Sequence, residues 1–193
     1  MEFILASSNE HKAEELNELL NISGTTIQPS KRKIDVVEDG STFQENALKK
    51  AQAYYNEFKN PTVADDSGLV IPARTDILGI YSARYAPEHE SYTDKNQALI
   101  KDISELSGEE RNAYFACYLC FYISPEEIYF FEGRVHGVIA SELKGDGGFG
   151  YDPIFLPEGQ SGKSLAELSE WKMTNSHRAK ACKAAVKFFQ GQN

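Results

Sequence analysis

The chain has 193 residues, of which 41% are hydrophobic and 25% charged, and its formal net charge at pH 7 is −9. This length suits a single domain of one or two lobes, and the composition is that of a globular protein. The acidic balance argues against a nucleic acid as the main partner, because binding its phosphates requires a basic surface. No apolar run approaches the ~20 residues that span a bilayer, and the apolar start is too short for a secretion signal. We therefore expect a cytoplasmic protein without membrane contact.

Residues 2–6 are typical of a first strand, which a polar turn connects to a helix with leucines at helical spacing. The free amides and the dipole of a helix N-terminus attract anions. Ser7, Ser8, Asn9 and Lys12 are therefore candidates for a phosphate site. Simple N-capping by serine or asparagine would also explain the turn, but it does not require a lysine in the first helical turn.

A short strand is predicted at residues 25–28 and a helix at residues 43–58. The helix opens with Thr42 and Glu45 at the spacing of a capping box. The polar loop before it contains Glu38, which by default is a solvated loop acid. Glu38 becomes a candidate metal ligand only if the fold brings it close to the acids of the next strand.

The central stretch, residues 62–71, is an apolar, β-prone run interrupted by two adjacent carboxylates and a hydroxyl, Asp65, Asp66 and Ser67. We expect the strand to end at these residues and to turn at Gly68. Acids at the carboxyl end of a strand are a common way for α/β proteins to present metal ligands and bases. A solvated turn is the alternative, since aspartate, serine and glycine are ordinary turn formers.

The middle of the chain predicts a compact loop, a helix and a two-stranded hairpin, at residues 79–86, 94–104, 113–123 and 128–135. The aromatic residues of the hairpin indicate core packing, cross-strand packing or an oligomer face. Cys117 and Cys120 lie three residues apart on a strand, so their side chains should point to opposite faces and cannot share a metal. With Cys182 the count is odd, and no disulfide framework is implied.

A glycine-rich loop at residues 145–153 contains Phe149, Tyr151 and Asp152. Glycines allow the backbone to approach a ligand closely, the two aromatic rings offer planar faces for stacking, and the aspartate offers an acceptor. A flexible surface loop is the alternative. The pattern favours a base-binding loop, because two aromatic rings between glycines are unusual in a purely flexible segment.

A helical turn is predicted at residues 164–169 and a last helix at residues 177–190, closed by Gly191. His177 and Arg178 occupy the first turn of that helix, where positive charge opposes the dipole. We therefore expect both side chains to face a ligand, with Lys172 just upstream.

Together these segments resemble the inosine/xanthosine triphosphate pyrophosphatase family, which hydrolyses non-standard purine nucleoside triphosphates. The matching blocks are Ser7–Asn9 with Lys12, Glu38 with residues 43–51, residues 64–69, 79–85, 148–155 and 176–178. One departure is Leu78, where the family usually has proline.

The resemblance implies a single two-lobed domain over residues 1–193, with an elongated mixed central sheet flanked by helices and an active-site cleft between the lobes. It implies a homodimer and Mg²⁺-dependent hydrolysis of ITP, dITP and XTP between the α- and β-phosphates. Glu38 and Asp66 would bind Mg²⁺, and Asp66 would be the proton acceptor. The residues implied in holding the triphosphate are Ser7, Ser8, Asn9, Glu10, His11, Lys12 and Lys50. Those implied in contacting the nucleotide are Ser67, Phe149, Gly150, Tyr151, Asp152, Lys172, His177 and Arg178.

Donors aimed at a 6-keto oxygen would reject adenine, which has an amino group at that position. Three alternatives remain open: a pyrophosphatase for other modified nucleotides, a non-catalytic purine-nucleotide sensor, and an interaction protein that uses the aromatic hairpin. Asp65 could also share the work of Asp66.

Overall fold

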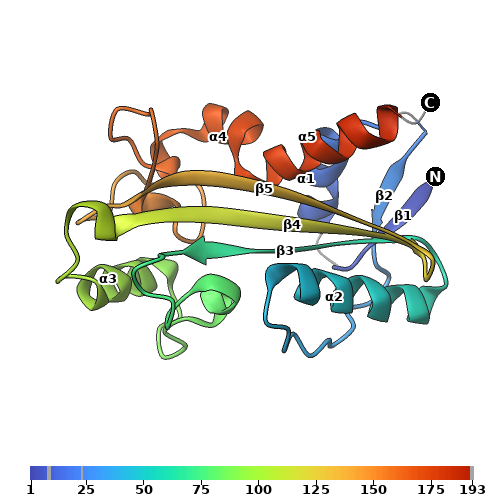
Figure 1. Cartoon of the computed structure of the whole chain (residues 1–193), viewed down its shortest axis with the longest axis horizontal. Coiled ribbons are helices and arrows are strands. Elements are labelled where there is room, and N and C mark those ends of the chain that lie inside the picture. Colours follow the sequence, from blue (N-terminus) through green and yellow to red (C-terminus); the bar gives the residue numbers. More distant parts are fainter. Residues whose placement is uncertain (8–9, 23, 192–193) are drawn as a thin grey trace. The chain divides into compact units, whose positions relative to one another are not determined.

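The computed structural model describes residues 1–7, 10–22 and 24–191, apart from the side chains of residues 10–12. Figure 1 shows its elements in chain order. The strands are β1 (Glu2–Leu5), β2 (Thr26–Pro29), β3 (Thr62–Val70), β4 (Asn112–Ser124), β5 (Glu127–Ile139) and β6 (Phe155–Pro157). The α-helices are α1 (Glu10–Leu20), α2 (Phe43–Phe58), α3 (Tyr92–Asp102), α4 (Ser169–Asn175) and α5 (His177–Gln190). Short 3₁₀ turns include η1 (Gly79–Arg84) and η4 (Leu165–Glu167).

The strands form one sheet in the order β2-β1-β3-β4-β5-β6. β1 pairs in parallel with β2 and β3, whereas β5 and β6 are antiparallel. The sheet is therefore mixed and flanked by helices, and the predicted α/β class is confirmed.

The chain divides into two compact units. Unit 1 contains residues 1–67 and 117–133 and the chain from Arg178 onward, and unit 2 contains residues 68–116 and 134–177. β3, β4 and β5 each contribute residues to both units.

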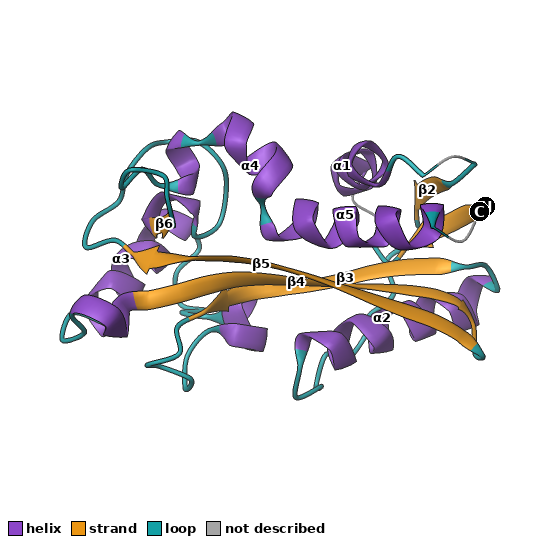
Figure 2. Ribbon diagram, turned by 45° about the horizontal axis from the view of Figure 1, so that its top comes forward, coloured by secondary structure: helices purple, strands orange, loops and turns teal. Residues whose placement is uncertain are grey.

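In unit 1, helices cover both faces of the sheet: α1 and α5 on one side and α2 on the other (Figure 2). The alternation of side chains along β3 matches these two layers. Val63 packs with α1 and α5 in a core that includes Leu16 and Cys182. Ala64, the next residue, packs against α2 with Ala47. The same alternation decides where the following acids point.

The cysteines follow this rule as predicted. Cys117 belongs to the core beneath α1 and α5, and Cys120 to the core beneath α2. Both are buried free thiols, as is Cys182. Burial raises the pKa of Cys120 to about 12, so this side chain behaves as a small apolar group.

Unit 2 has its own core, in which Leu69 at the end of β3 and Leu99 of α3 are completely buried. Arg111 closes one side of this core, because its guanidinium donates hydrogen bonds to the carbonyls of Ile139 and Ala140 at 2.9 and 2.7 Å. Leu78 has a φ of +62°, which proline cannot adopt. The sequence has leucine here, where the family it resembles usually has proline, and the backbone conformation at this position excludes proline.

The helix boundaries agree closely with the local signals. α2 begins after Thr42, whose hydroxyl accepts from the Glu45 N–H at 3.1 Å. The reciprocal half of the predicted capping box differs, because the Glu45 carboxylate accepts from the N–H of Ser41 rather than Thr42. α5 has the predicted bounds, and the Gly191 N–H continues to the carbonyl of Lys187 at 3.2 Å. Across the described ranges, no helix is long and apolar enough to cross a membrane.

Candidate active site

The position of the two central acids corrects one prediction. β3 does not end at Asp66 or turn at Gly68, and it runs on to Val70. The strand continues because Leu69 is buried in the core of unit 2. Asp65 and Asp66 therefore lie within an extended strand and point to opposite faces of the sheet.

Asp66 lies on the α2 side, where Lys50 links it to Glu38. The Lys50 Nζ atom is 3.1 Å from Asp66 Oδ1 and 3.4 Å from Glu38 Oε2. The side chains of Lys50 and Asp66 are only 16% and 12% exposed. Two carboxylates that are far from each other in sequence thus contact the same ammonium group. Glu38 therefore lies close to an acid of the next strand, which was the condition for considering it a metal ligand.

Burial raises the pKa of Asp66, and the attraction of Lys50 only partly opposes this effect. Burial also acts to lower the pKa of Lys50, but the nearby carboxylates outweigh it and the net pKa is raised. The Asn46 amide approaches Asp66 as well and acts to lower its pKa. Even so, Asp66 Oδ2 is buried without a well-formed hydrogen bond to any described residue. This oxygen is available to a ligand.

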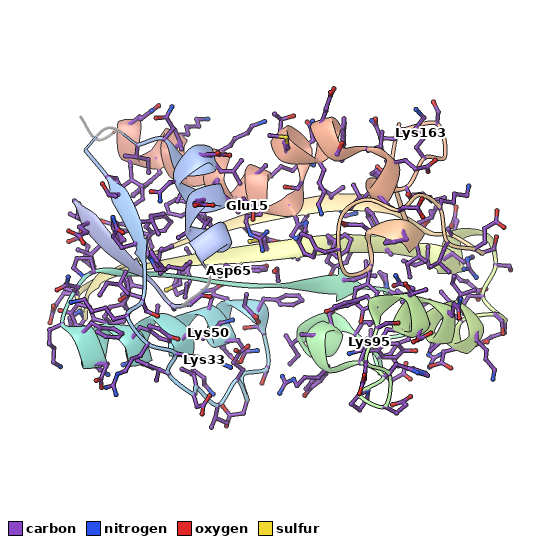
Figure 3. The ribbon with its side chains drawn as sticks, turned by 180° about the vertical axis from the view of Figure 1, so that it is seen from behind. Glu15, Lys33, Lys50, Asp65, Lys95 and Lys163 are labelled. Atoms are coloured by element: carbon purple, nitrogen blue, oxygen red, sulfur yellow. The ribbon has the colours of Figure 1, made fainter. Side chains whose placement is uncertain are left out.

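Asp65 lies on the other face and has a different partner. Its Oδ2 atom is 3.2 Å from Arg178 Nη2 at the start of α5, and Arg178 Nη1 is 3.2 Å from Glu15 Oε2 of α1. Figure 3 labels Glu15 and Asp65. Burial acts to lower the pKa of Arg178, but the surrounding negative charge, chiefly that of Asp65, raises it overall. The positive charge in the first turn of α5 is thus compensated by two carboxylates of unit 1.

A cavity of about 220 Å³ lies beside Lys50. Its walls include Ser7, Glu38 and Lys33, and Figure 3 labels Lys33 and Lys50. Tyr54 forms another wall and holds the loop in place, because its hydroxyl accepts from the Ile34 N–H at 3.0 Å. Lys33 is not among the residues predicted from the sequence. The signal that could have found it is the basic run Lys31-Arg32-Lys33 in an otherwise acidic chain.

The glycine-rich loop in unit 2 presents one exposed ring. Phe149 is 67% exposed, and the Lys172 ammonium lies 4.1 Å from its ring centroid. Lys172 also forms an ion pair with Asp152. The Oδ2 atom of Asp152 accepts a hydrogen bond from the Phe149 N–H at 2.8 Å. An added side-chain atom at Gly148 would lie 2.2 Å from Asp152 Oδ2. This close approach explains the glycine and defines a compact set of a ring, a cation and a carboxylate.

Two other predicted nucleotide contacts in unit 2 are buried. Tyr151 is 4% exposed, and its hydroxyl donates to the Ser82 carbonyl at 2.6 Å. His177 is stacked on Phe115, with ring centroids 4.9 Å apart and an interplanar angle of 11°. These side chains have clear packing roles, and their contact with a nucleotide stays a prediction.

The predicted residues thus fall into two described groups. Unit 1 gathers Ser7, Glu38, Lys50 and Asp66, and separately pairs Arg178 with Asp65. Ser67 ends unit 1 as a half-buried residue of β3. Unit 2 gathers Phe149, Gly150, Asp152 and Lys172. The predictions for Ser8, Asn9 and the side chains of Glu10, His11 and Lys12 lie outside the described residues.

The donor set near Lys50 fits a magnesium ion. Over the described residues, no group of three or more His, Cys, Asp or Glu side chains could hold a metal. Mg²⁺ does not need such a group, because it is usually held by one or two carboxylates together with water and substrate phosphates. Glu38 and Asp66 supply those carboxylates, and the unpaired Oδ2 of Asp66 is a suitable oxygen ligand.

These features define a mixed α/β protein with a carboxylate–lysine centre in one unit and an aromatic, glycine-rich loop in the other. Comparison with known proteins identifies its family. The chain belongs to the Ham1 family, whose model matches residues 3–188.

Relatives and solved structures agree with this assignment. The dITP/XTP pyrophosphatase of Aquifex aeolicus is 41% identical over 96% of this chain and 95% of its own length. The dITP/XTP pyrophosphatase of Treponema denticola is 40% identical over 99% and 100%. The structure of the Staphylococcus aureus Ham1 protein matches with a TM-score of 0.89 at 34% identity and covers 100% of both chains. The family resemblance seen in the sequence is confirmed.

Proposed function

We propose that this protein is an enzyme that hydrolyses non-standard purine nucleoside triphosphates, namely dITP, ITP and XTP, to the nucleoside monophosphate and pyrophosphate. The observation that carries the proposal is the shared position of Glu38 and Asp66 around Lys50, with one oxygen of Asp66 left available. The names of the relatives supply the substrate class. Cleavage of a polyanion by positioning and charge neutralisation requires this kind of centre.

Glu38 and Asp66 would hold Mg²⁺. When bound, the metal would neutralise charge on the phosphates and polarise the phosphorus that is attacked. It also reconciles a chain of net charge −9 with a polyanionic substrate. Lys50 balances the two carboxylates in the protein itself and would turn to the phosphates when substrate binds.

Asp66 would accept the proton from the attacking water. Its raised pKa makes it a stronger base than an ordinary aspartate. Asp65 is a poorer candidate, because it points to the opposite face of β3 and is neutralised by Arg178. The raised pKa favours Asp66 over its neighbour, and its Oδ1 atom becomes available when Lys50 turns to the phosphates.

The triphosphate would be held by Ser7, Lys33 and Lys50 around the cavity in unit 1, together with residues 8–12 of the predicted anion site. A cavity of about 220 Å³ has room for phosphate groups and several waters, since one water takes up ~30 Å³.

The base would stack on Phe149, whose ring is exposed and backed by Lys172. A donor directed at the 6-keto oxygen would leave adenine with an unmatched amino group, which lowers its rate by several orders of magnitude. Contacts of Ser67, Gly150, Tyr151, His177 and Arg178 with the nucleotide, the homodimer and the cytoplasmic location stay predictions.

The test is product analysis with Mg²⁺ on ITP, XTP, dITP, GTP and ATP, with pyrophosphate and orthophosphate assayed separately. We expect pyrophosphate from the first three and slow reaction of GTP and ATP. Orthophosphate as the first product would refute the cleavage position. Tight binding of ITP without turnover would refute the catalytic role and favour a nucleotide sensor.

A further inference from the structure

The loop that carries Phe149 loses much conformational entropy when it becomes ordered. It contains Gly147, Gly148 and Gly150, and each ordered residue costs about 1–2 kcal/mol of conformational entropy, with glycine at the high end. An exposed ring on a mobile loop would bind a base weakly, because binding would have to order the loop first. The structure should therefore contain bonds that hold this loop in place.

Two such bonds reach the loop from distant parts of unit 2. The Tyr151 hydroxyl donates to the carbonyl of Ser82, and the Ser82 hydroxyl in turn accepts from the Leu69 N–H at 3.0 Å. The Asn96 amide of α3 donates to the carbonyl of Gly150 at 3.0 Å, across 54 residues of sequence. These bonds hold the loop at and directly after its backbone reversal at Gly150, where φ is +65°.

Asn96 is unusual because it is a polar side chain only 1% exposed to solvent. Its Oδ1 atom has no hydrogen-bond partner among the described residues. A buried acceptor without a partner costs about 1–3 kcal/mol, a cost that an apolar side chain would avoid while leaving the Gly150 carbonyl without this donor. Among the described residues, the hydrogen bond of the Asn96 side chain goes to the loop next to Phe149. What Asn96 contributes is therefore a donor to the carbonyl of Gly150, which is adjacent to Phe149 in the chain.

We propose that Asn96 is a positioning residue for base recognition, which holds the Gly150 carbonyl so that the Phe149 ring is in place before substrate arrives. This inference rests on the proposed function. Asn96 lies in unit 2 and makes no described contact with Asp66 or Lys50. Its loss should therefore weaken binding of the base and leave the hydrolytic step intact.

The experiment compares steady-state hydrolysis of ITP by wild type, Asn96→Ala and the isosteric Asn96→Asp, which replaces the donor by an acceptor. We expect KM to rise about 10-fold with kcat within about 2-fold of wild type, as for loss of one hydrogen bond plus loop order. Inhibition by inorganic tripolyphosphate, which has no base, should be unchanged. Amide hydrogen exchange of residues 145–152 should accelerate in both variants.

Leu99→Ala is the matched control. Leu99 lies one turn further along α3 and is completely buried, so its truncation weakens the same helix without removing the bond to Gly150. The control should retain the wild-type KM. A rise in KM for Leu99→Ala equal to that of Asn96→Ala would overturn the inference, as would a fall in kcat at unchanged KM.

If Asn96→Ala does not fold, Asn96→Asp and Tyr151→Phe decide the question. Tyr151→Phe removes only the bond to Ser82 and should also raise KM and accelerate exchange in the loop. Unchanged KM in both variants would refute the positioning role. Absence of ITP hydrolysis by the wild type would instead refute the proposed function.

Discussion

Replacing Lys50 by methionine tests the charged centre of unit 1. The change keeps the volume of the side chain and leaves Asp66 buried without its cation. At 3.1 Å and an effective dielectric constant of about 20, the lost attraction is about 5 kcal/mol before solvation is counted. Breaking a buried pair costs about 3–5 kcal/mol in measured cases. Asp66 can also take up a proton when its cation is gone, and this sets an upper limit on the loss. pH 7 lies about 3 units above the pKa of ~3.9 of an ordinary aspartate, and each unit corresponds to 1.36 kcal/mol, so the limit at pH 7 is about 4 kcal/mol.

We therefore expect Lys50→Met to lower the free energy of unfolding by about 3 kcal/mol at pH 7 and by no more than about 1.5 kcal/mol at pH 5, where Asp66 takes up a proton more easily. The assay is urea unfolding in EDTA at the two pH values. Lys49→Met is the control, because Lys49 pairs with Asp39 at an exposed position, and an exposed pair contributes about 0–1 kcal/mol. Equal losses in the two variants, or a loss independent of pH, would refute this account of the centre.

Three further predictions concern the reaction. Asp66→Asn should lower kcat for ITP by at least about 100-fold, yet leave the melting temperature in EDTA at pH 8 no lower than that of wild type, because burial penalises the charged carboxyl. In wild type, kcat/KM should fall as pH decreases through the raised pKa of Asp66, at a pH above the ~3.9 of an ordinary aspartate. Phe149→Ala should raise KM for ITP about 10-fold, as expected for loss of one stacked base, with little change in kcat.

The Asp66→Asn and Phe149→Ala predictions each have a distinct contrary result, as does the effect of pH on the stability contributed by Asp66. A clear drop in the melting temperature of Asp66→Asn would mean that the carboxylate stabilises the fold. Because the pKa of Asp66 is raised in the native state, the carboxyl lowers the free energy of unfolding only at pH values where it is ionised. The stability difference between wild type and Asp66→Asn should therefore vanish in acid. A stability difference that grows in acid would mean that the native state lowers this pKa instead. An unchanged KM in Phe149→Ala would remove the ring from the base site.

Local signals in the sequence predicted much of the fold correctly. The bounds of α2 and α5 follow from capping residues and a terminal glycine, which act within one turn. The opposite orientation of Cys117 and Cys120 follows from the two-residue period of a strand. α4 and β6 were not predicted. β6 has only three residues and pairs with β5 by long-range contact, so its own sequence carries little signal.

The sequence by itself determined the family of this protein and the candidate residues, because six motifs in order are a property of the chain alone. Only the tertiary structure decided which of the candidate site residues contact one another. Asp65 and Asp66 are neighbours in sequence, yet one pairs with Arg178 and the other with Lys50, because each face of β3 is covered by a different helix. The grouping of Glu38 with Asp66, and of Asn96 with Gly150, depends on contacts between segments distant in sequence. Local propensity cannot encode such contacts, because they form only when the elements pack.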